Sequence, residues 1–235
     1  MRSKRSPRMA KVSLAAHMKE NPAEPDQDEV KAGPFITISR QYGCWGFSLG
    51  LMLLDLLNDL VEPPTSWRIY HKEILDKLAS ETSMDAESLE KQRRTKPRML
   101  TDFFRSLGKD RVPSGYEIRN RITEIIRSLA TEGHVIIIGQ GGSGATHDLP
   151  NGLAVRLEAP EDWRVKQIAF REGLTDTEAR LRVRAREQER EYLRKIYEAR
   201  FPRKPAFNLV YDCSVFPLST IAQHVVQALK LLKTI

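Results

Sequence analysis

Short apolar segments alternate along the chain with longer segments in which apolar residues recur at helical spacing. The short segments, which we predict as strands, are Phe35–Ser39, Trp67–Tyr70, His134–Ile138, Leu153–Leu157 and Asn208–Tyr211. The third is almost continuously apolar, as is typical of a strand buried on both faces. Because strands alternate with helices, we expect an α/β fold with three layers, in which helices cover both faces of a parallel sheet.

The intervals between these strands carry the helical pattern. We predict helices over Phe47–Leu60, Lys72–Ser80, Tyr116–Thr131, Pro160–Glu172, Asp176–Ala199 and Leu218–Lys233. Asp176 follows a Gly-Leu-Thr break and is expected to cap the helix that starts there. The polar and basic segment 82–113 interrupts the alternation between the second and third strands, so we interpret it as a helical insertion rather than as core.

Residues 1–34 have the composition of a flexible tail, because they begin basic, turn acidic and contain several prolines. An organelle transit peptide is the alternative interpretation of this start. The remainder, 35–235, has the length of one domain with a substantial core. Its longest apolar run, around Leu49–Leu57, is broken by Asp55 and is too short to span a membrane. We therefore expect a soluble protein without a membrane partner.

The chain is basic, with 38 Lys and Arg against 31 Asp and Glu, and its net charge at pH 7 is +7. This balance favours an anionic partner such as a nucleotide, a nucleic acid or an acidic surface, without choosing among them. The only two cysteines, Cys44 and Cys213, have no metal-ligand spacing. We expect a reducing compartment, and therefore a cytoplasmic location.

The segment FITISRQYGCWGFSLG, residues 35–50, runs from the first predicted strand through a turn into a helix. Gly43 and Gly46 would let the backbone approach a phosphate closely, and the start of the helix would attract it. Against a Walker loop, the lysine position holds Gly46 and the Ser/Thr position holds Phe47. Ser48 lies one place later and is the candidate ligand for Mg²⁺. An ordinary strand-to-helix turn, with Trp45 and Phe47 packed on the core, is the competing interpretation.

Six motifs in a fixed order resemble the cytidylate kinase-like family, a branch of the P-loop nucleoside monophosphate kinases. They are ISRQYGCWGFSLG, WRIYHKEILDKLA, VIIIGQGG, DLPNGLAVRLEAPEDWRVKQI, REGLTDTEARLRVRAREQEREYLRKIY and FNLVYDCS. Each motif is short, and their shared order from Phe35 to the C-terminus is the specific part. The resemblance implies phosphoryl transfer from ATP, with Mg²⁺, to a cytidine-type monophosphate.

The same resemblance implies a five-stranded parallel core within 35–235. It also implies a helical acceptor-side insertion at about 72–131 and a mobile lid at about 174–204. The expected partners are nucleotide substrates, and the protein would be a monomer or a homodimer. Residues implied to hold the ATP phosphates are Arg40, Gly43, Cys44, Trp45, Gly46, Phe47 and Ser48, with Ser48 as the Mg²⁺ ligand. Those implied on the acceptor side are His71, Lys72, Gln140 and Gly141.

An arginine row marks the predicted lid helix, where Arg182, Arg186, Arg190 and Arg194 recur at every fourth residue. Like charges at this spacing destabilise a helix by about 0.2–0.5 kcal/mol per pair, so carboxylates such as Glu187 should offset them. A solvated, salt-bridged face is one interpretation of the row. Planar guanidinium groups also suit the charge of a transferring phosphate. By resemblance Arg190 is the catalytic arginine, Glu187 its orienting carboxylate, and Arg184 and Arg186 supporting catalytic residues.

Four positions depart from the family pattern. Trp45 replaces a glycine, Phe47 a basic residue, His71 an acceptor-side aspartate and Gln140 an arginine. These departures motivate an alternative function, a catalytically weak or inactive nucleotide-binding protein of the same fold. A basic nucleic-acid-binding protein is a further alternative, although the chain lacks interleaved aromatic residues and any nucleic-acid recognition motif.

Overall fold

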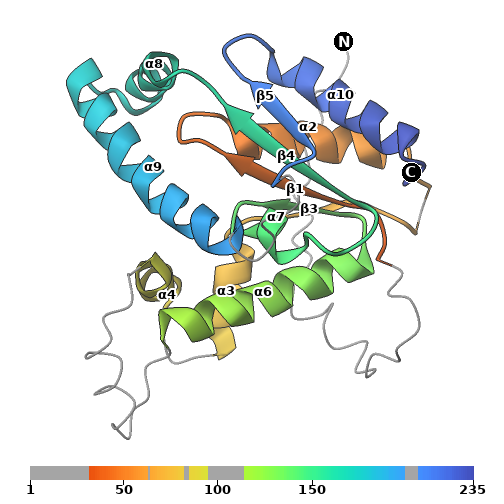
Figure 1. Ribbon diagram of the computed structural model, residues 1–235. Coiled ribbons are helices and arrows are strands. Elements are labelled where there is room, and N and C mark those ends of the chain that lie inside the picture. Colours follow the sequence, from red (N-terminus) through yellow and green to blue (C-terminus); the bar gives the residue numbers. More distant parts are fainter. Residues whose placement is uncertain (1–31, 63, 82–84, 95–113, 199–205) are drawn as a thin grey trace, which may run out of the picture.

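The computed structural model describes residues 32–62, 64–81, 85–94, 114–198 and 206–235. In this part of the chain, five parallel strands form one sheet between two layers of helices (Figure 1). The strands are β1 (Phe35–Arg40), β2 (Arg68–Tyr70), β3 (Val135–Ile138), β4 (Gly152–Glu158) and β5 (Leu209–Asp212). All five predicted strands and the three-layer α/β class are confirmed.

The strand order is β2-β3-β1-β4-β5, so β1 is the central strand. It pairs in parallel with β3 on one side and with β4 on the other, with Ile36 opposite both Ile136 and Leu153. All four residues of β3 are buried, which agrees with its continuous apolar sequence. The carboxyl ends of β1 and β3 therefore lie next to each other, where parallel sheets bind ligands.

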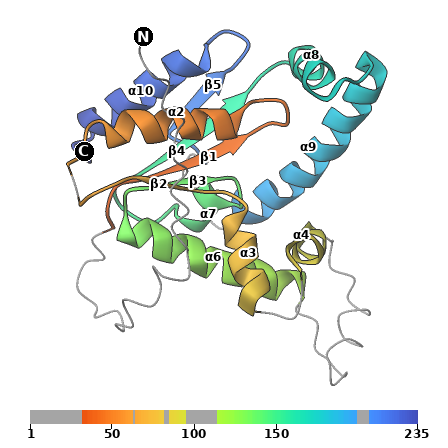
Figure 2. The same cartoon turned by 180° about the vertical axis from the view of Figure 1, so that it is seen from behind.

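Helices α2 (Gly46–Asn58) and α10 (Leu218–Leu231) cover one face of the sheet (Figure 2). The apolar residues of α2 that are buried, Leu49, Leu53 and Leu57, recur at a spacing of four and therefore share one side of the helix. They pack in one core cluster with Ile36 and Ile38 of β1 and with residues of α10.

The opposite face is covered by α3 (Glu73–Glu81), α4 (Ala86–Arg94), α6 (Gly115–Glu132) and the short α7 (Gly142–Ala145). Ser114 begins α6 with a capping box, in which its hydroxyl accepts from the Glu117 N–H and the Glu117 carboxylate accepts from the Ser114 N–H. Buried isoleucines of α6 pack against Phe35, Val135 and Ile137. Helix α6 is thus a layer of the core, although it falls within the segment expected as an insertion.

Helices α8 (Glu161–Glu172) and α9 (Asp176–Glu198) pack against each other at one end of the molecule (Figure 1). Val165, Ile168, Ala179 and Val183 bury their side chains between the two helices. The C-terminal half of α9 then reaches α7 and α4, on the other side of the sheet edge. Among the helices described, none has an apolar stretch long enough to cross a membrane.

The cap of α9 differs from the sequence prediction. The Thr175 hydroxyl accepts from the Glu178 N–H, and the Glu178 carboxylate accepts from both the N–H and the hydroxyl of Thr175. Because Asp176 is already the first helical residue, the predicted cap at Asp176 was wrong by one position. A Thr-x-x-Glu capping box explains the shift.

Candidate functional site

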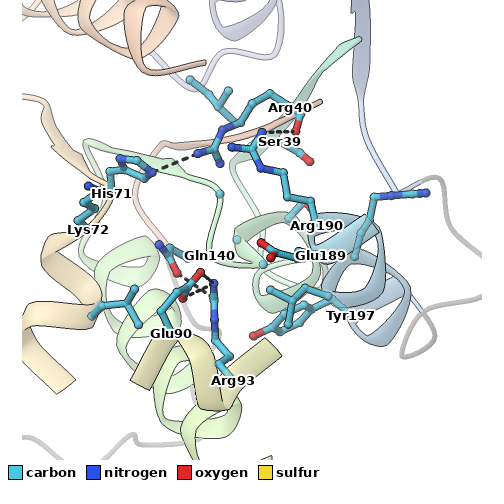
Figure 3. A pocket seen from close by; sticks show the side chains of 18 of the residues that line it. Ser39, Arg40, His71, Lys72, Glu90, Arg93, Gln140, Glu189, Arg190 and Tyr197 are labelled. Carbon is cyan, nitrogen blue, oxygen red and sulfur yellow. Dashed lines mark hydrogen bonds and ion pairs between the residues drawn. The ribbon is translucent and has the colours of Figure 1, made fainter. Parts of the chain in front are cut away.

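A cavity of about 1260 Å³ opens at the carboxyl ends of β1 and β3. Its walls come from the segment after β3, from α9, and from α3 and α4 (Figure 3). Nine Lys and Arg residues line it against four Asp and Glu residues, so the cavity is cationic. Such a surplus of positive charge suits a ligand with several negative charges.

Arg40, the last residue of β1, extends into this cavity (Figure 3). Two glycines make room for its side chain, because a Cβ at Gly139 would lie 2.0 Å from Arg40 Nη1 and one at Gly46 would lie 3.0 Å from Arg40 Cδ. Its Nη2 lies 3.1 Å from His71 Nε2. Burial, followed by the charges of Arg190 and Arg156, lowers the pKa of Arg40 to about 9. A bound anion would remove this unfavourable crowding of positive charge.

Arg190 reaches Arg40 from α9. Its Nη1 lies 3.4 Å from the carbonyl oxygen of Arg40, and its guanidinium carbon lies 5.0 Å from the centre of the Tyr42 ring. Arg156, a buried residue of the neighbouring strand β4, donates to the Ser39 hydroxyl at 2.8 Å. Three arginines from three separate elements thus converge at the end of the central strand.

Glu187 occupies the gap between α9 and the turn after β1. Its carboxylate accepts a hydrogen bond from the Tyr42 N–H at 2.8 Å and lies 3.8 Å from the guanidinium groups of both Arg156 and Arg164. A backbone N–H and two guanidinium groups are the donors that a phosphate oxygen would use. The turn therefore binds an anion in this structure, and that anion is a side chain of the protein itself.

The other α9 arginines divide between the cavity and α8. Arg186 lines the cavity and pairs with Glu189 at 3.3 Å. Arg184 instead donates to Glu161 at 2.9–3.0 Å and does not line the cavity. Arg184 is expected as a supporting catalytic residue, but its position on the helix directs it toward the N-terminal end of α8.

The predicted phosphate turn points mostly away from the cavity. Gly43 packs against Arg164, Cys44 is buried in the core, and the Trp45 indole donates to Gln167 of α8 at 3.3 Å. None of the predicted turn residues after Arg40 lines the cavity; these are Gly43, Cys44, Trp45, Gly46, Phe47 and Ser48. Their expected contact with the phosphates stays a prediction, and the Arg40 side chain fills the space beside Gly46.

The predicted acceptor residues His71, Lys72, Gln140 and Gly141 all line the cavity. Burial, followed by the charge of Arg40, lowers the pKa of His71 to about 4, so its imidazole is neutral at pH 7. Gln140 adopts a φ of 59°, which is uncommon for a residue with a side chain. Its amide oxygen accepts from Nη1 of the buried Arg93 at 2.8 Å.

Sequence reasoning missed several residues that shape this site. Arg93 belongs to the basic run of α4, and Tyr197 packs on Gly141, where a Cβ would lie 2.2 Å from its ring. Arg156 carried a detectable signal, because it is a charged residue inside an otherwise apolar strand. Tyr42 and Glu90 carried no such signal, since neither interrupts an apolar or helical pattern in the sequence.

A structure of an uncharacterized protein from Eubacterium ventriosum aligns with a TM-score of 0.58 and 18% identity, covering 84% of this chain and 98% of that chain. Shikimate kinase from Bacteroides thetaiotaomicron aligns with a TM-score of 0.45 and 14% identity, covering 84% of this chain and 98% of that chain. Shikimate kinase from Acinetobacter baumannii, in complex with shikimate, aligns with a TM-score of 0.46 and 16% identity, covering 86% of this chain and 96% of that chain.

No curated protein sequence matches the chain. A model of the cytidylate kinase-like family, in contrast, matches residues 35–215, which is most of the chain and includes every element that lines the cavity. The first structural likeness independently supports the fold. The chain therefore belongs to the cytidylate kinase-like family.

Proposed function

We propose that this protein transfers a phosphoryl group from ATP to a nucleoside monophosphate, with CMP or dCMP as the acceptor. The observation that carries the proposal is the convergence of Arg40, Arg156 and Arg190 at the end of the central strand. Phosphoryl transfer needs positioning and neutralisation of charge rather than covalent help from the protein. Three guanidinium groups in a largely buried site supply both.

Arg40 and Arg190 are the residues that would contact the transferring phosphoryl group. Arg40 is held in place by His71 and by packing on two glycines, whereas Arg190 comes from a different helix. Arg186 lines the same wall and would add charge toward the leaving diphosphate. Glu187 and Arg156 would act by positioning, since their contacts connect α9 to the sheet.

The acceptor would bind on the side of the cavity formed by α3, α4 and the segment after β3. Lys72 and Arg93 offer positive charge to its phosphate, and the Gln140 amide offers donors to a pyrimidine edge. A phosphate acceptor already carries a nucleophilic oxygen and needs no general base. The neutral His71 suits this chemistry, because it orients Arg40 without adding a further positive charge.

Mg²⁺ would arrive with the nucleotide. Among the described residues, no group of three or more His, Cys, Asp or Glu could hold a metal ion. Mg²⁺ in kinases is commonly bound through substrate phosphates and one or two carboxylates. Asp76 and Glu189 line the cavity and offer such oxygens, whereas Ser48 does not line it. When bound, Mg²⁺ neutralises charge on the β- and γ-phosphates.

Nucleotide binding without turnover is the second candidate function. It is favoured by the turn after β1, where the Tyr42 N–H is already bonded to Glu187 and the next six residues do not line the cavity. A protein that holds nucleotides by arginines alone could bind them without aligning the transfer.

One experiment separates these functions. Full-length protein is incubated with ATP, Mg²⁺ and each of CMP, dCMP, UMP, AMP and GMP, and ADP is measured, while calorimetry measures binding of ATP and of each monophosphate. ADP formation that depends on CMP or dCMP supports the proposal. Binding without ADP formation supports the second candidate function. Absence of both binding and ADP formation would overturn both candidate functions.

A further inference from the structure

The only two cysteines of the chain meet although they come from opposite ends of the domain. Cys44 lies in the turn after β1 and is buried, whereas Cys213 follows β5 and is partly exposed. Their side chains interact with each other. Both cysteines contribute to one core cluster, Cys44 from within it and Cys213 packed against it.

The end of β4 explains this meeting, because β1 and β5 flank that strand on its two sides. On one side, the Gln41 N–H donates to the Leu157 carbonyl at 2.9 Å and the Gln41 amide oxygen accepts from the Ala159 N–H at 2.9 Å. On the other side, the Cys213 N–H donates to the Glu158 carbonyl at 2.8 Å. The turn and the end of β5 are therefore both held to the same three residues of the chain.

We propose that Cys44 and Cys213 are a modification site, at which a peroxide or a disulfide oxidant forms a reversible intramolecular disulfide. The bond would join the turn after β1 to the end of β5. Gln41, three residues before Cys44, and Cys213 itself are both anchored to the end of β4.

The two thiols have different chemical roles. The interaction with Cys44 lowers the pKa of Cys213, and the interaction with Cys213, followed by burial, raises the pKa of Cys44. The partly exposed Cys213 is therefore the thiolate that reacts first, since the thiolate is the nucleophile. Buried Cys44 is the resolving thiol.

With hydrogen peroxide, the Cys213 thiolate attacks one oxygen, the O–O bond breaks and hydroxide leaves, which gives a sulfenic acid. The Cys44 sulfur then attacks the Cys213 sulfur, the S–O bond breaks, and the Cys44 proton leaves with the departing hydroxide as water. Two thiols lose two electrons and the peroxide gains them. A dithiol such as dithiothreitol reverses the change by thiol–disulfide exchange.

The disulfide would restrain the segment that connects Arg40 to α2. A phosphate that uses the Tyr42 N–H must first displace Glu187, and a turn tied to β5 adapts less readily. We therefore expect oxidation to weaken ATP binding by about tenfold, within the usual range of coupling between two sites. This consequence rests on the proposed function, whereas formation of the disulfide does not.

The test treats the full chain with hydrogen peroxide, then counts free thiols and maps the linked peptides by mass spectrometry. We expect loss of both thiols, a mass lower by two hydrogen atoms, and a peptide pair that joins Cys44 to Cys213. Cys213→Ser is the matched control, and it should form no internal disulfide. Two free thiols, a disulfide between separate chains, or oxidation of each cysteine alone would overturn the proposal.

Calorimetry with ATP then compares reduced, oxidised and re-reduced protein. The affinity should fall on oxidation, recover with dithiothreitol, and stay unchanged in peroxide-treated Cys213→Ser. An internal disulfide with unchanged affinity would overturn the coupling to binding. If the reduced protein binds no ATP, the proposed function fails, and the thiol count still decides whether the disulfide forms.

Discussion

Individual side chains decide the chemistry that this site can perform, and Arg40 is the most constrained of them. Its guanidinium is largely buried beside the neutral His71 and close to Arg190 and Arg156. The pKa of Arg40 falls to about 9 because burial and like charges oppose its positive form, yet the group stays charged at neutral pH. A site that holds positive charge at such a cost is poised to bind an anion.

Arg190→Ala should lower the rate of phosphoryl transfer by about 10³-fold, because a positioned arginine contributes at least this much in related chemistry. The matched control is Arg184→Ala on the same helix, since Arg184 pairs with Glu161 and does not line the cavity. It should leave the rate nearly unchanged. Steady-state kinetics and thermal melting of both variants check the prediction, and equal losses of rate in the two would contradict it.

His71 gives the protein a distinct dependence of stability on pH. Its pKa is about 4 in the folded protein against an ordinary value of 6.5, so the unfolded chain binds the proton more readily. The stabilisation is complete above pH 6.5 and is lost as the pH falls from 6.5 toward 4. His71→Gln cannot take up this proton and should lose less stability between pH 7 and pH 5.

Denaturant unfolding of the wild type and His71→Gln across this range measures the difference. The pKa of His134 is also lowered by burial, but His134 is present in both proteins and cancels in the comparison. Parallel stability profiles for the two proteins would show that His71 is not the titrating group.

Among helices and strands, α9 connects the site to the rest of the fold. Its first turn is held by the capping box of Thr175 and Glu178, and its last turns reach α7 and α4. Thr175→Ala should destabilise the protein by about 1 kcal/mol, the usual contribution of such a cap. This corresponds to a fall in melting temperature of about 2–4 °C for a chain of this size.

Thr175→Ser retains a hydroxyl at the same position and is the matched control for that substitution. It should melt within experimental error of the wild type, whereas Thr175→Ala should melt lower. If both variants melt like the wild type, the capping box contributes nothing to the stability of α9.

Strands and helices were predictable because their signals are local. The apolar runs located all five strands to within one residue at either end, and helical spacing located α2, α6 and α10. The cap of α9 was missed by one position because Thr175 and Asp176 are both good capping residues. Only the side-chain contacts of Glu178 distinguish them.

The site was less predictable, since its geometry depends on which way each segment turns. The sequence indicated His71 and Gln140 at strand ends and Arg190 on a long helix, and all three line the cavity. It could not show that Trp45 turns toward α8 or that Arg184 pairs with Glu161, because both contacts join residues far apart in the chain.

At the scale of the whole molecule, nine of the Lys and Arg residues that the structure describes line one cavity. The exposed arginines of α9 are paired with carboxylates, Arg180 with Glu161 and Asp162, and Arg182 with Glu172. Within the arginine row, Arg182 pairs with Glu172 of α8, whereas Arg186 and Arg194 pair with Glu189 and Glu191 of α9 itself.

We therefore expect only weak, non-specific binding of single-stranded RNA or DNA. Fluorescence anisotropy with a labelled oligonucleotide at physiological salt should give no saturable binding in the micromolar range, about the upper limit of non-specific affinity. Heparin should compete equally well for any signal at low salt. Tight binding that persists at physiological salt would restore the nucleic-acid alternative.

Because the Tyr42 N–H donates a hydrogen bond to Glu187, any phosphate that binds this N–H must compete with the Glu187 carboxylate. Binding there is an exchange of one anion for another, so the observed affinity reports only the difference between them. Removing the Glu187 carboxylate should therefore raise the affinity for free phosphate, although it disturbs the alignment of α9. Affinity and turnover would then respond to position 187 in opposite directions.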